Sequence, residues 1–272
     1  MEATAPQTPQ ATTAAHPQRA PRIAPRANPP VFWKLVRFAL SDYFRTAWVF
    51  LNVAVLVGVH ALFFKYPSGQ SHFFGIEYAA TMLQAALTCA VMFSRSNRAE
   101  SYAILARQVP RASYVGAIML AAWLVAVLAY ALSALFDLVY FSEWVTGQPL
   151  QAWQTPANYA LGSVPVLVGG AFAVCLVTLL STFVSTSAVR LATMTLIAVL
   201  VMSFDARNFP VEAVRPFLQN IPPVLAPLAG ALKFAVEQDN IATVSIAMLG
   251  GYTLLMLVIA LVLSGTRELI LD

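Results

Sequence analysis

Charged side chains are scarce in this chain of 272 residues. Asp, Glu, Lys and Arg together make up 10% of the sequence, whereas hydrophobic residues make up 59%. Soluble domains contain about 25% charged and about 45–50% apolar residues, so this composition excludes an ordinary water-soluble enzyme. The formal net charge of +4 is too small to indicate a nucleic-acid partner. We therefore expect a protein that is embedded in a lipid bilayer.

Residues that carry catalysis or bind metals are also few. The two cysteines, Cys89 and Cys175, lie in apolar runs and are expected to be small buried residues rather than a disulfide or metal ligands. The three histidines, His16, His60 and His72, lack the spacing of metal ligands. No Gly-x-Ser-x-Gly, His-Glu-x-x-His or Walker A motif occurs. The chain is therefore not expected to be an enzyme or to bind a metal or cofactor directly.

Long apolar runs make up most of the rest of the sequence. A transmembrane helix needs about 20 mainly apolar residues. Six runs approach or exceed this length, the fifth being the shortest: about 46–64, 76–94, 113–136, 159–184, 187–204 and 242–264. The sequence thus predicts an all-α membrane protein with six transmembrane helices in one domain over residues 31–272.

The N-terminal segment has a different composition. Residues 1–30 are rich in Ala, Pro, Thr and Gln and contain no apolar core of a signal peptide. Because such a segment has little apolar surface to bury, we expect a disordered cytoplasmic tail; the alternative is a weak tether to lipid headgroups.

The basic residues predict the orientation of the spans. With six spans, twelve of the 16 Lys and Arg residues fall on the same side as the N-terminus. The positive-inside rule then predicts that both termini are cytoplasmic and that the protein is a multi-pass protein of the cytoplasmic (inner) membrane of the cell.

An amphipathic segment precedes the first span. Residues 31–45 follow the helix-stopping pair Pro29-Pro30, and their basic residues recur at helical spacing on one face, with apolar residues on the others. This pattern predicts an interfacial helix that lies along the membrane and contacts lipid headgroups. The basic face consists of Lys34, Arg37 and Arg45. The alternative is an extension of the first span.

The connection between the second and third spans carries most of the remaining charge. Asn97 and Glu100 have the spacing of a capping box, and Pro110 would end the helix that they begin. We interpret this short helix, near 97–109, as a docking element for a cytoplasmic partner; the alternative is a solvated connector. The residues assigned to docking are Arg98, Glu100, Tyr102, Leu105, Arg107 and Arg111.

A proline-rich segment over 205–240 precedes the last span. Within it, residues 224–236 are apolar but too few to cross a bilayer, which favours a re-entrant or interfacial helix. Such a helix would either form an outer gate or simply pack against the last two spans. The candidate gate residues are Pro222, Pro223, Leu228 and Phe234.

Ionisable residues are predicted to avoid the middle of the spans. Glu77, Asp137 and Asp205 fall at span ends, and His60 lies near the outer end of the first span. A charge at the centre of a transmembrane helix costs about 2.5–3.5 kcal/mol and is kept only for function. This distribution disfavours an ion-coupled secondary transporter, which stays an alternative together with a membrane scaffold or assembly factor that transports nothing.

The order of these segments resembles the permease subunit of a type-2 ATP-binding cassette (ABC) transporter, from residue 31 to the end of the chain. The most specific local similarity is Glu100 followed by LARQVPRASYVG over 105–116. In that family, an acidic residue and a Leu-rich stretch precede an Arg-x-x-Tyr element that leads into the third span. Arg111 and Tyr114 occupy that element here.

The resemblance implies a partner and a mechanism. Two permease subunits, identical or homologous, would stand above two ABC ATPase subunits, which bind ATP and Mg. The segment from Arg98 to Arg107 would be the coupling helix, residues 31–45 would brace its movement, and 205–240 would form the outer gate. Members of the family mostly export lipids, glycans, drugs or peptides, so the resemblance implies an exporter.

Overall fold

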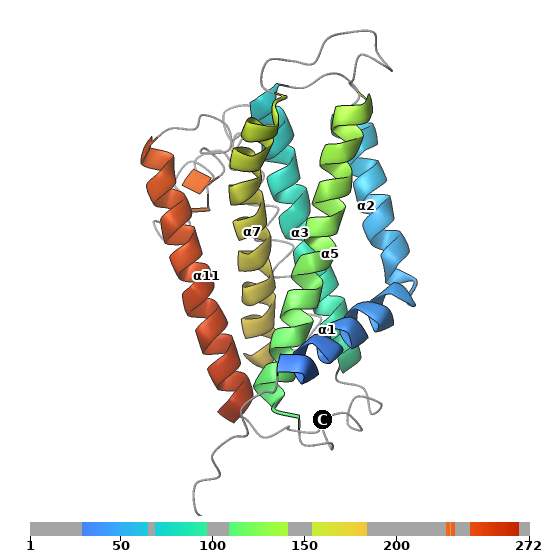
Figure 1. Cartoon of the computed structure of the whole chain (residues 1–272), viewed down its shortest axis with the longest axis vertical. Coiled ribbons are helices and arrows are strands. Elements are labelled where there is room, and N and C mark those ends of the chain that lie inside the picture. The colour runs from blue at the N-terminus through green and yellow to red at the C-terminus, as the bar shows by residue number, and fades with distance from the viewer. Residues whose placement is uncertain are drawn as a thin grey trace, which may run out of the picture.

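The computed structural model describes residues 29–64, 69–96, 109–140, 154–183, 227–228, 230–231 and 240–266. These residues form helices and contain no strand, as the sequence predicts. The helices, labelled as in Figure 1, are α1 (Pro29–Phe44), α2 (Trp48–Phe63), α3 (Gln70–Ser96), α5 (Arg111–Tyr140), α7 (Pro156–Phe183) and α11 (Asn240–Thr266).

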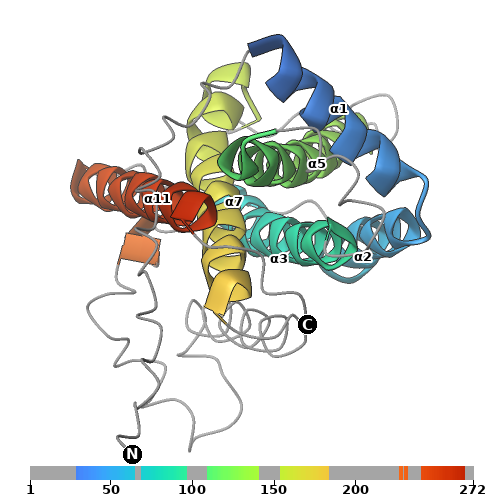
Figure 2. The same ribbon diagram turned by 90° about the horizontal axis from the view of Figure 1, so that it is seen from below.

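Three long helices, α3, α5 and α7, form the centre of the bundle (Figures 1 and 2). α3 packs along both α7 and α5, and its contact with α7 is the most extensive in the described part of the chain. α2 packs against α3 and α5 on one side of this centre, whereas α11 packs against α7 and α5 on the opposite side. α1 crosses one end of the bundle against α5. We call that end the α1 end and the other the distal end.

Four helices are long and apolar enough to cross a membrane. In lipid, backbone groups must be satisfied within the segment, and a helix of this length does so. The candidate spans are His72–Arg95, Arg111–Val139, Pro156–Ser181 and Thr243–Gly265. They correspond to the predicted spans 76–94, 113–136, 159–184 and 242–264. The described part of the chain is thus all-helical, and its apolar helices support a multi-pass membrane protein.

The helix at the first predicted span, 46–64, is shorter than the four candidate spans. α2 has 16 residues and, taken alone, is about 24 Å long, less than the roughly 30 Å of a bilayer's apolar layer. Taken together, α1 and α2 have the length and composition of a span that is bent by 75°. The predicted span 187–204 lies outside the described residues. So does the predicted tail, except for Pro29 and Pro30, which begin α1 instead of preceding it.

Close packing of α3 on α7 depends on glycine. A Cβ atom added at Gly162 of α7 would stand 2.3 Å from the ring of Phe74, and one added at Gly169 would stand 2.5 Å from the ring of Tyr78. Both rings belong to α3 and are buried. The glycines therefore let two bulky aromatic side chains lie directly on the α7 backbone, which is how membrane helices approach closely.

Candidate functional site

Polar side chains from three helices are buried together at the distal end of the bundle. Glu77 of α3 is 2% exposed, and Ser133 and Asp137 of α5 are each 1% exposed. Ser133 and Asp137 are one helical turn apart and so share a face of α5. His60, in the last turn of α2, completes the group.

Glu77, Ser133 and His60 form a hydrogen-bonded chain, which we call the Glu77–Ser133–His60 trio. Ser133 Oγ is hydrogen-bonded to Glu77 Oε1 and lies 3.3 Å from His60 Nε2. The other ring nitrogen, His60 Nδ1, lies 3.1 Å from the carbonyl oxygen of Leu56 one turn earlier in α2. The trio therefore joins α3, α5 and α2 through side chains alone.

Asp137 belongs to a second set of hydrogen bonds, directed towards α7. Its Oδ2 accepts a hydrogen bond of 2.7 Å from the Tyr159 hydroxyl and one of 3.3 Å from Gln154 Nε2. Buried carboxyl groups need such donors because their desolvation is unfavourable. The two sets together bring polar groups of four helices into one region.

A groove between α2 and α5 leads to the trio. It has a volume of about 590 Å³ and is mainly apolar. His60 and Ser133 contribute the polar groups in its wall, and the His60 ring lies edge-on to Phe136, with the ring centres 4.8 Å apart. The lining residues are Leu56, Val57, His60, Ala61, Phe64, Leu132, Ser133 and Phe136. Two members of the trio thus face the groove, and Ser133 connects them to Glu77.

This arrangement is suited to holding or passing a proton. A carboxyl, a hydroxyl and an imidazole in sequence can each donate or accept, depending on where the proton is. Within the described ranges, no group of three His, Cys, Asp or Glu side chains is placed to hold a metal ion.

Sequence reasoning missed this cluster because it placed Glu77, Asp137 and His60 at span ends. Glu77 is five residues inside the candidate span His72–Arg95, or about 7 Å from its end. The available signal was local: Glu77 and Asp137 are each flanked on both sides by apolar residues, as in FFGIEYAA and ALFDLVYF. What the sequence could not show is that His60 and Ser133, 17 and 56 residues away, meet Glu77.

The predicted interfacial residues lie on the outward face of α1. Lys34, Arg37 and Arg45 are exposed, whereas Leu35, Val36 and Tyr43 on the other side are buried. α1 therefore has one apolar face covered by the bundle, and the basic residues are left uncovered by the described residues. Large apolar side chains of α1 are exposed as well, namely Val31, Trp33, Phe38 and Phe44. Contact of the basic residues with lipid stays a prediction.

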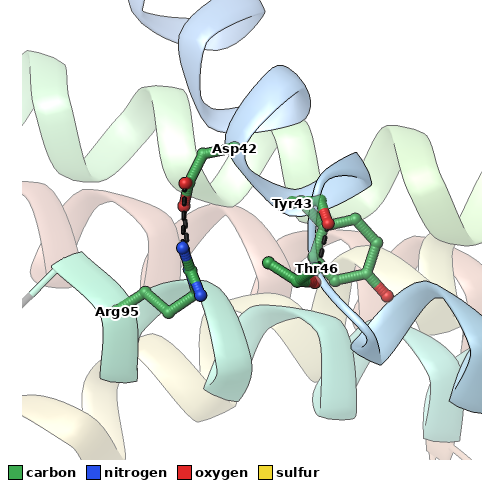
Figure 3. A network of polar contacts seen from close by, with 4 residues as sticks. All are labelled: Asp42, Tyr43, Thr46 and Arg95. Atoms are coloured by element: carbon green, nitrogen blue, oxygen red, sulfur yellow. Dashed lines mark hydrogen bonds and ion pairs between the residues drawn. The ribbon is translucent and has the colours of Figure 1, made fainter.

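The α1 end of the bundle is held by polar contacts as well (Figure 3). Arg95, next to the end of α3, donates to both carboxylate oxygens of Asp42 in α1, at 2.9 and 3.0 Å. At the bend after α1, Thr46 Oγ1 donates to the Tyr43 carbonyl at 2.7 Å. α1 is therefore fixed to α3 one residue before that helix ends.

A buried amide fixes the bend itself. Asn52 of α2 donates from Nδ2 to the Tyr43 hydroxyl at 2.7 Å and to Thr88 Oγ1 of α3 at 2.8 Å. Buried polar groups of this kind hold membrane helices together. α1, α2 and α3 thus meet in a polar joint at the α1 end.

Most of the predicted docking and gate residues lie outside the described residues. Arg111, from the docking group, begins α5 and is half-buried. Leu228, from the gate group, is 2% exposed, and its carbonyl accepts a 3.3 Å hydrogen bond from the Tyr78 hydroxyl of α3. The predicted residues outside the description are Arg98, Glu100, Tyr102, Leu105, Arg107, Pro222, Pro223 and Phe234.

Comparison with known proteins does not assign this chain to a family. No protein-family model matches the chain, and neither a curated protein nor a solved structure is significantly similar to it. Functional inference therefore depends on the order of the elements and on the two polar regions described above.

Proposed function

We propose that this chain is the permease subunit of an ABC transporter, with exporter activity, and that it works with ATPase subunits on separate chains. The observation that supports this most is the joint at the α1 end. There α1, with its basic face uncovered, is turned 75° from α2 and ion-paired through Asp42 to Arg95. Arg95 lies immediately before the predicted docking segment near 97–109.

In this proposal, two ATPase subunits bind ATP and Mg and push on the docking segment. The displacement passes along α3, which runs without a break from Arg95 to Glu77, a distance of about 27 Å. A rigid element of this kind can couple two sites if it has two stable positions that nucleotide binding biases. α1 braces the moving end through Asp42. A second permease copy or a homologue completes the transporter.

The docking segment can be tested by charge reversal. Tagged protein purified from its native membrane in mild detergent is expected to bring with it a stoichiometric protein that contains a Walker A motif. Arg107→Glu is expected to abolish that association, because it reverses a charge at the proposed contact, while leaving membrane insertion intact. The matched control is Arg22→Glu in the N-terminal tail, which makes the same charge change elsewhere. Association that survives Arg107→Glu and Glu100→Ala together would remove the docking role.

A second candidate function, an ion-coupled secondary transporter, is favoured by one observation. Glu77 and Asp137 lie near span ends, as the sequence predicts, but both are buried between helices, and buried ionisable residues in membrane helices usually serve ion or proton movement. Vesicles that contain only this chain separate the two candidates. Uptake or export driven by a pH gradient without nucleotide would support the second candidate and exclude the first.

A further inference from the structure

We propose that the Glu77–Ser133–His60 trio is a binding site for a single proton, and that this proton moves between Glu77 and His60 through the Ser133 hydroxyl. This proposal goes beyond the transport function and does not depend on an ATPase. It follows from counting the donors and acceptors that the three side chains present to one another.

The first step concerns the His60 ring. Its Nδ1 lies 3.1 Å from the Leu56 carbonyl oxygen, and a carbonyl oxygen only accepts hydrogen bonds. Nδ1 must therefore carry a hydrogen. In a neutral imidazole one nitrogen is protonated and the other is not, so Nε2 of neutral His60 is an acceptor.

The second step concerns Ser133. Its hydroxyl has one hydrogen but two neighbours, Glu77 Oε1 and His60 Nε2. If Glu77 is ionised and His60 is neutral, both neighbours are acceptors, and one of the two contacts sets lone pairs against each other. One additional proton completes both hydrogen bonds. The observed arrangement thus calls for one proton more than an ionised Glu77 and a neutral His60 provide.

That proton can be held in two ways. In the first, the Glu77 carboxyl donates to Ser133 Oγ, and the Ser133 hydroxyl donates to Nε2 of neutral His60. In the second, Glu77 is a carboxylate that accepts from the Ser133 hydroxyl, and Nε2–H of the His60 imidazolium donates to Ser133 Oγ. Transfer moves the Glu77 proton to Ser133 Oγ while the Ser133 proton moves to His60 Nε2. The trio is electrically neutral overall in both states.

The surrounding titratable groups favour retention of the proton. From α5, Asp137 interacts electrostatically with both Glu77 and His60, and Tyr130 interacts with Glu77. From α7, Tyr159 donates to Asp137, and that bond together with the one from Gln154 stabilises Asp137 as a carboxylate. Next to Glu77 on α3, Tyr78 donates away from the trio, to Leu228. A negative Asp137 beside the trio opposes a second negative charge on Glu77.

The groove gives the proton a way in. His60 and Ser133 line it, while Glu77 does not. Proton exchange with the groove therefore occurs at His60, and the Ser133 hydroxyl carries the proton on to Glu77. The walls are apolar, so an isolated charge there would be poorly solvated, and a neutral trio avoids that penalty.

The test measures both ends of the trio in the same sample. The full chain is placed in lipid nanodiscs near neutral pH, without nucleotide. Nitrogen-15 NMR of labelled histidine gives the imidazolium fraction of His60, and infrared spectroscopy with carbon-13 glutamate gives the protonated fraction of Glu77, assigned by difference against Glu77→Gln. The two fractions are expected to add to one. A sum near zero or near two would overturn the proposal.

Two variants test further whether Glu77 and His60 share one proton. In Glu77→Gln the amide N–H can donate to Ser133, so both hydrogen bonds form without the extra proton, and the His60 imidazolium signal is expected to be lost. His72 serves as an internal control, because it contacts Phe64 and the Phe63 carbonyl, outside the trio. Its signal should not change. Asp137→Asn should preserve the sum of one but lower the imidazolium share, since the nearby negative charge is removed.

An imidazolium signal that persists in Glu77→Gln would show that His60 titrates independently and would overturn the shared proton. Should Glu77→Gln fail to fold, the difference against Glu77→Asp, which also removes the labelled glutamate, assigns the Glu77 signal, so the sum measured in the unchanged protein still decides. Since no ATPase is present, failure here leaves the proposed transport function intact, and loss of ATPase association on Arg107→Glu would leave this proposal intact.

Discussion

At the scale of single residues, the buried carboxyl groups are the unusual feature of this protein. An isolated charge in the middle of a transmembrane helix costs about 2.5–3.5 kcal/mol on insertion scales. Glu77 and Asp137 lie nearer the ends of their spans but are buried, and hydrogen bonds offset their desolvation. Glu77 is bonded to Ser133, which contacts His60, and Asp137 accepts from Tyr159 and Gln154. Each hydrogen bond to a buried group therefore matters more than its strength in water suggests.

We expect Ser133→Ala to lower the free energy of unfolding by about 1–3 kcal/mol, because it leaves the Glu77 carboxyl and His60 Nε2 without the partner that joins them. Unfolding of the purified chain by denaturant in detergent measures this. The matched control is Ser264→Ala. Ser264 is also buried, but its hydrogen bond within the described residues goes to the Ala260 carbonyl of its own helix. Equal losses in the two variants would contradict a special role for Ser133.

At the scale of helices, two kinds of contact hold the bundle. Aromatic rings of α3 lie on α7 glycines in the centre, and the polar joint of Asp42, Arg95, Tyr43, Asn52 and Thr88 lies at the α1 end. The first depends on close approach, and the second on paired polar groups. Substitutions that disturb these two kinds of contact are therefore expected to affect stability differently.

Gly162→Ala is expected to destabilise the protein by about 1–3 kcal/mol, since the new methyl group overlaps the buried Phe74 ring and forces it to move. The same substitution at Gly250 of α11 is the control. No described atom lies within 4 Å of a Cβ there, so the gain in helix propensity, up to about 1 kcal/mol, should dominate. Thermal unfolding in detergent distinguishes the two. Destabilisation at Gly250 as large as at Gly162 would argue against the packing explanation.

Asp42→Asn is expected to loosen α1 while changing global stability little. The Asp42 and Arg95 side chains are 39% and 30% exposed, and pairs of this exposure contribute about 0.2–1 kcal/mol. The measurement is the rate of trypsin cleavage after Arg37 and Arg45 in nanodiscs, which should rise. Asp42→Glu, which keeps the negative charge and adds no trypsin site, should leave the rate slow. A rate that the first variant leaves unchanged would show that α1 is held by its apolar face alone.

At the scale of the whole molecule, the apolar runs predicted the helices better than the polar residues predicted the buried site. Four of the six predicted apolar runs correspond to α3, α5, α7 and α11, because a run of that length in lipid has to satisfy its own backbone. The first run, 46–64, was harder, since α2 fills it with only 16 residues and is turned by 75° from α1, at a bend where Asn52 contacts Tyr43 and Thr88. Nothing in the local pattern of either segment specifies that angle.

The orientation of the bundle can be tested with single cysteines. If both termini are cytoplasmic, a cysteine at Ser142 should react with a membrane-impermeant thiol reagent in intact cells. A cysteine at Ser96 should react only after permeabilisation. The native Cys89 is completely buried and should stay unlabelled in both cases. Labelling with the opposite sidedness would contradict the prediction that both termini are cytoplasmic.

The sequence by itself determined that this chain forms apolar helices in a membrane and that α1 has a basic face. Both follow from hydropathy and spacing along one segment, which a linear pattern records. Only the tertiary structure decided that Glu77 meets Ser133 and His60, because the three lie on different helices and their distances depend on how those helices are rotated and packed. A carboxyl that resembles a span-end residue in the sequence is thereby bonded to a serine of a second helix, which in turn contacts a histidine of a third.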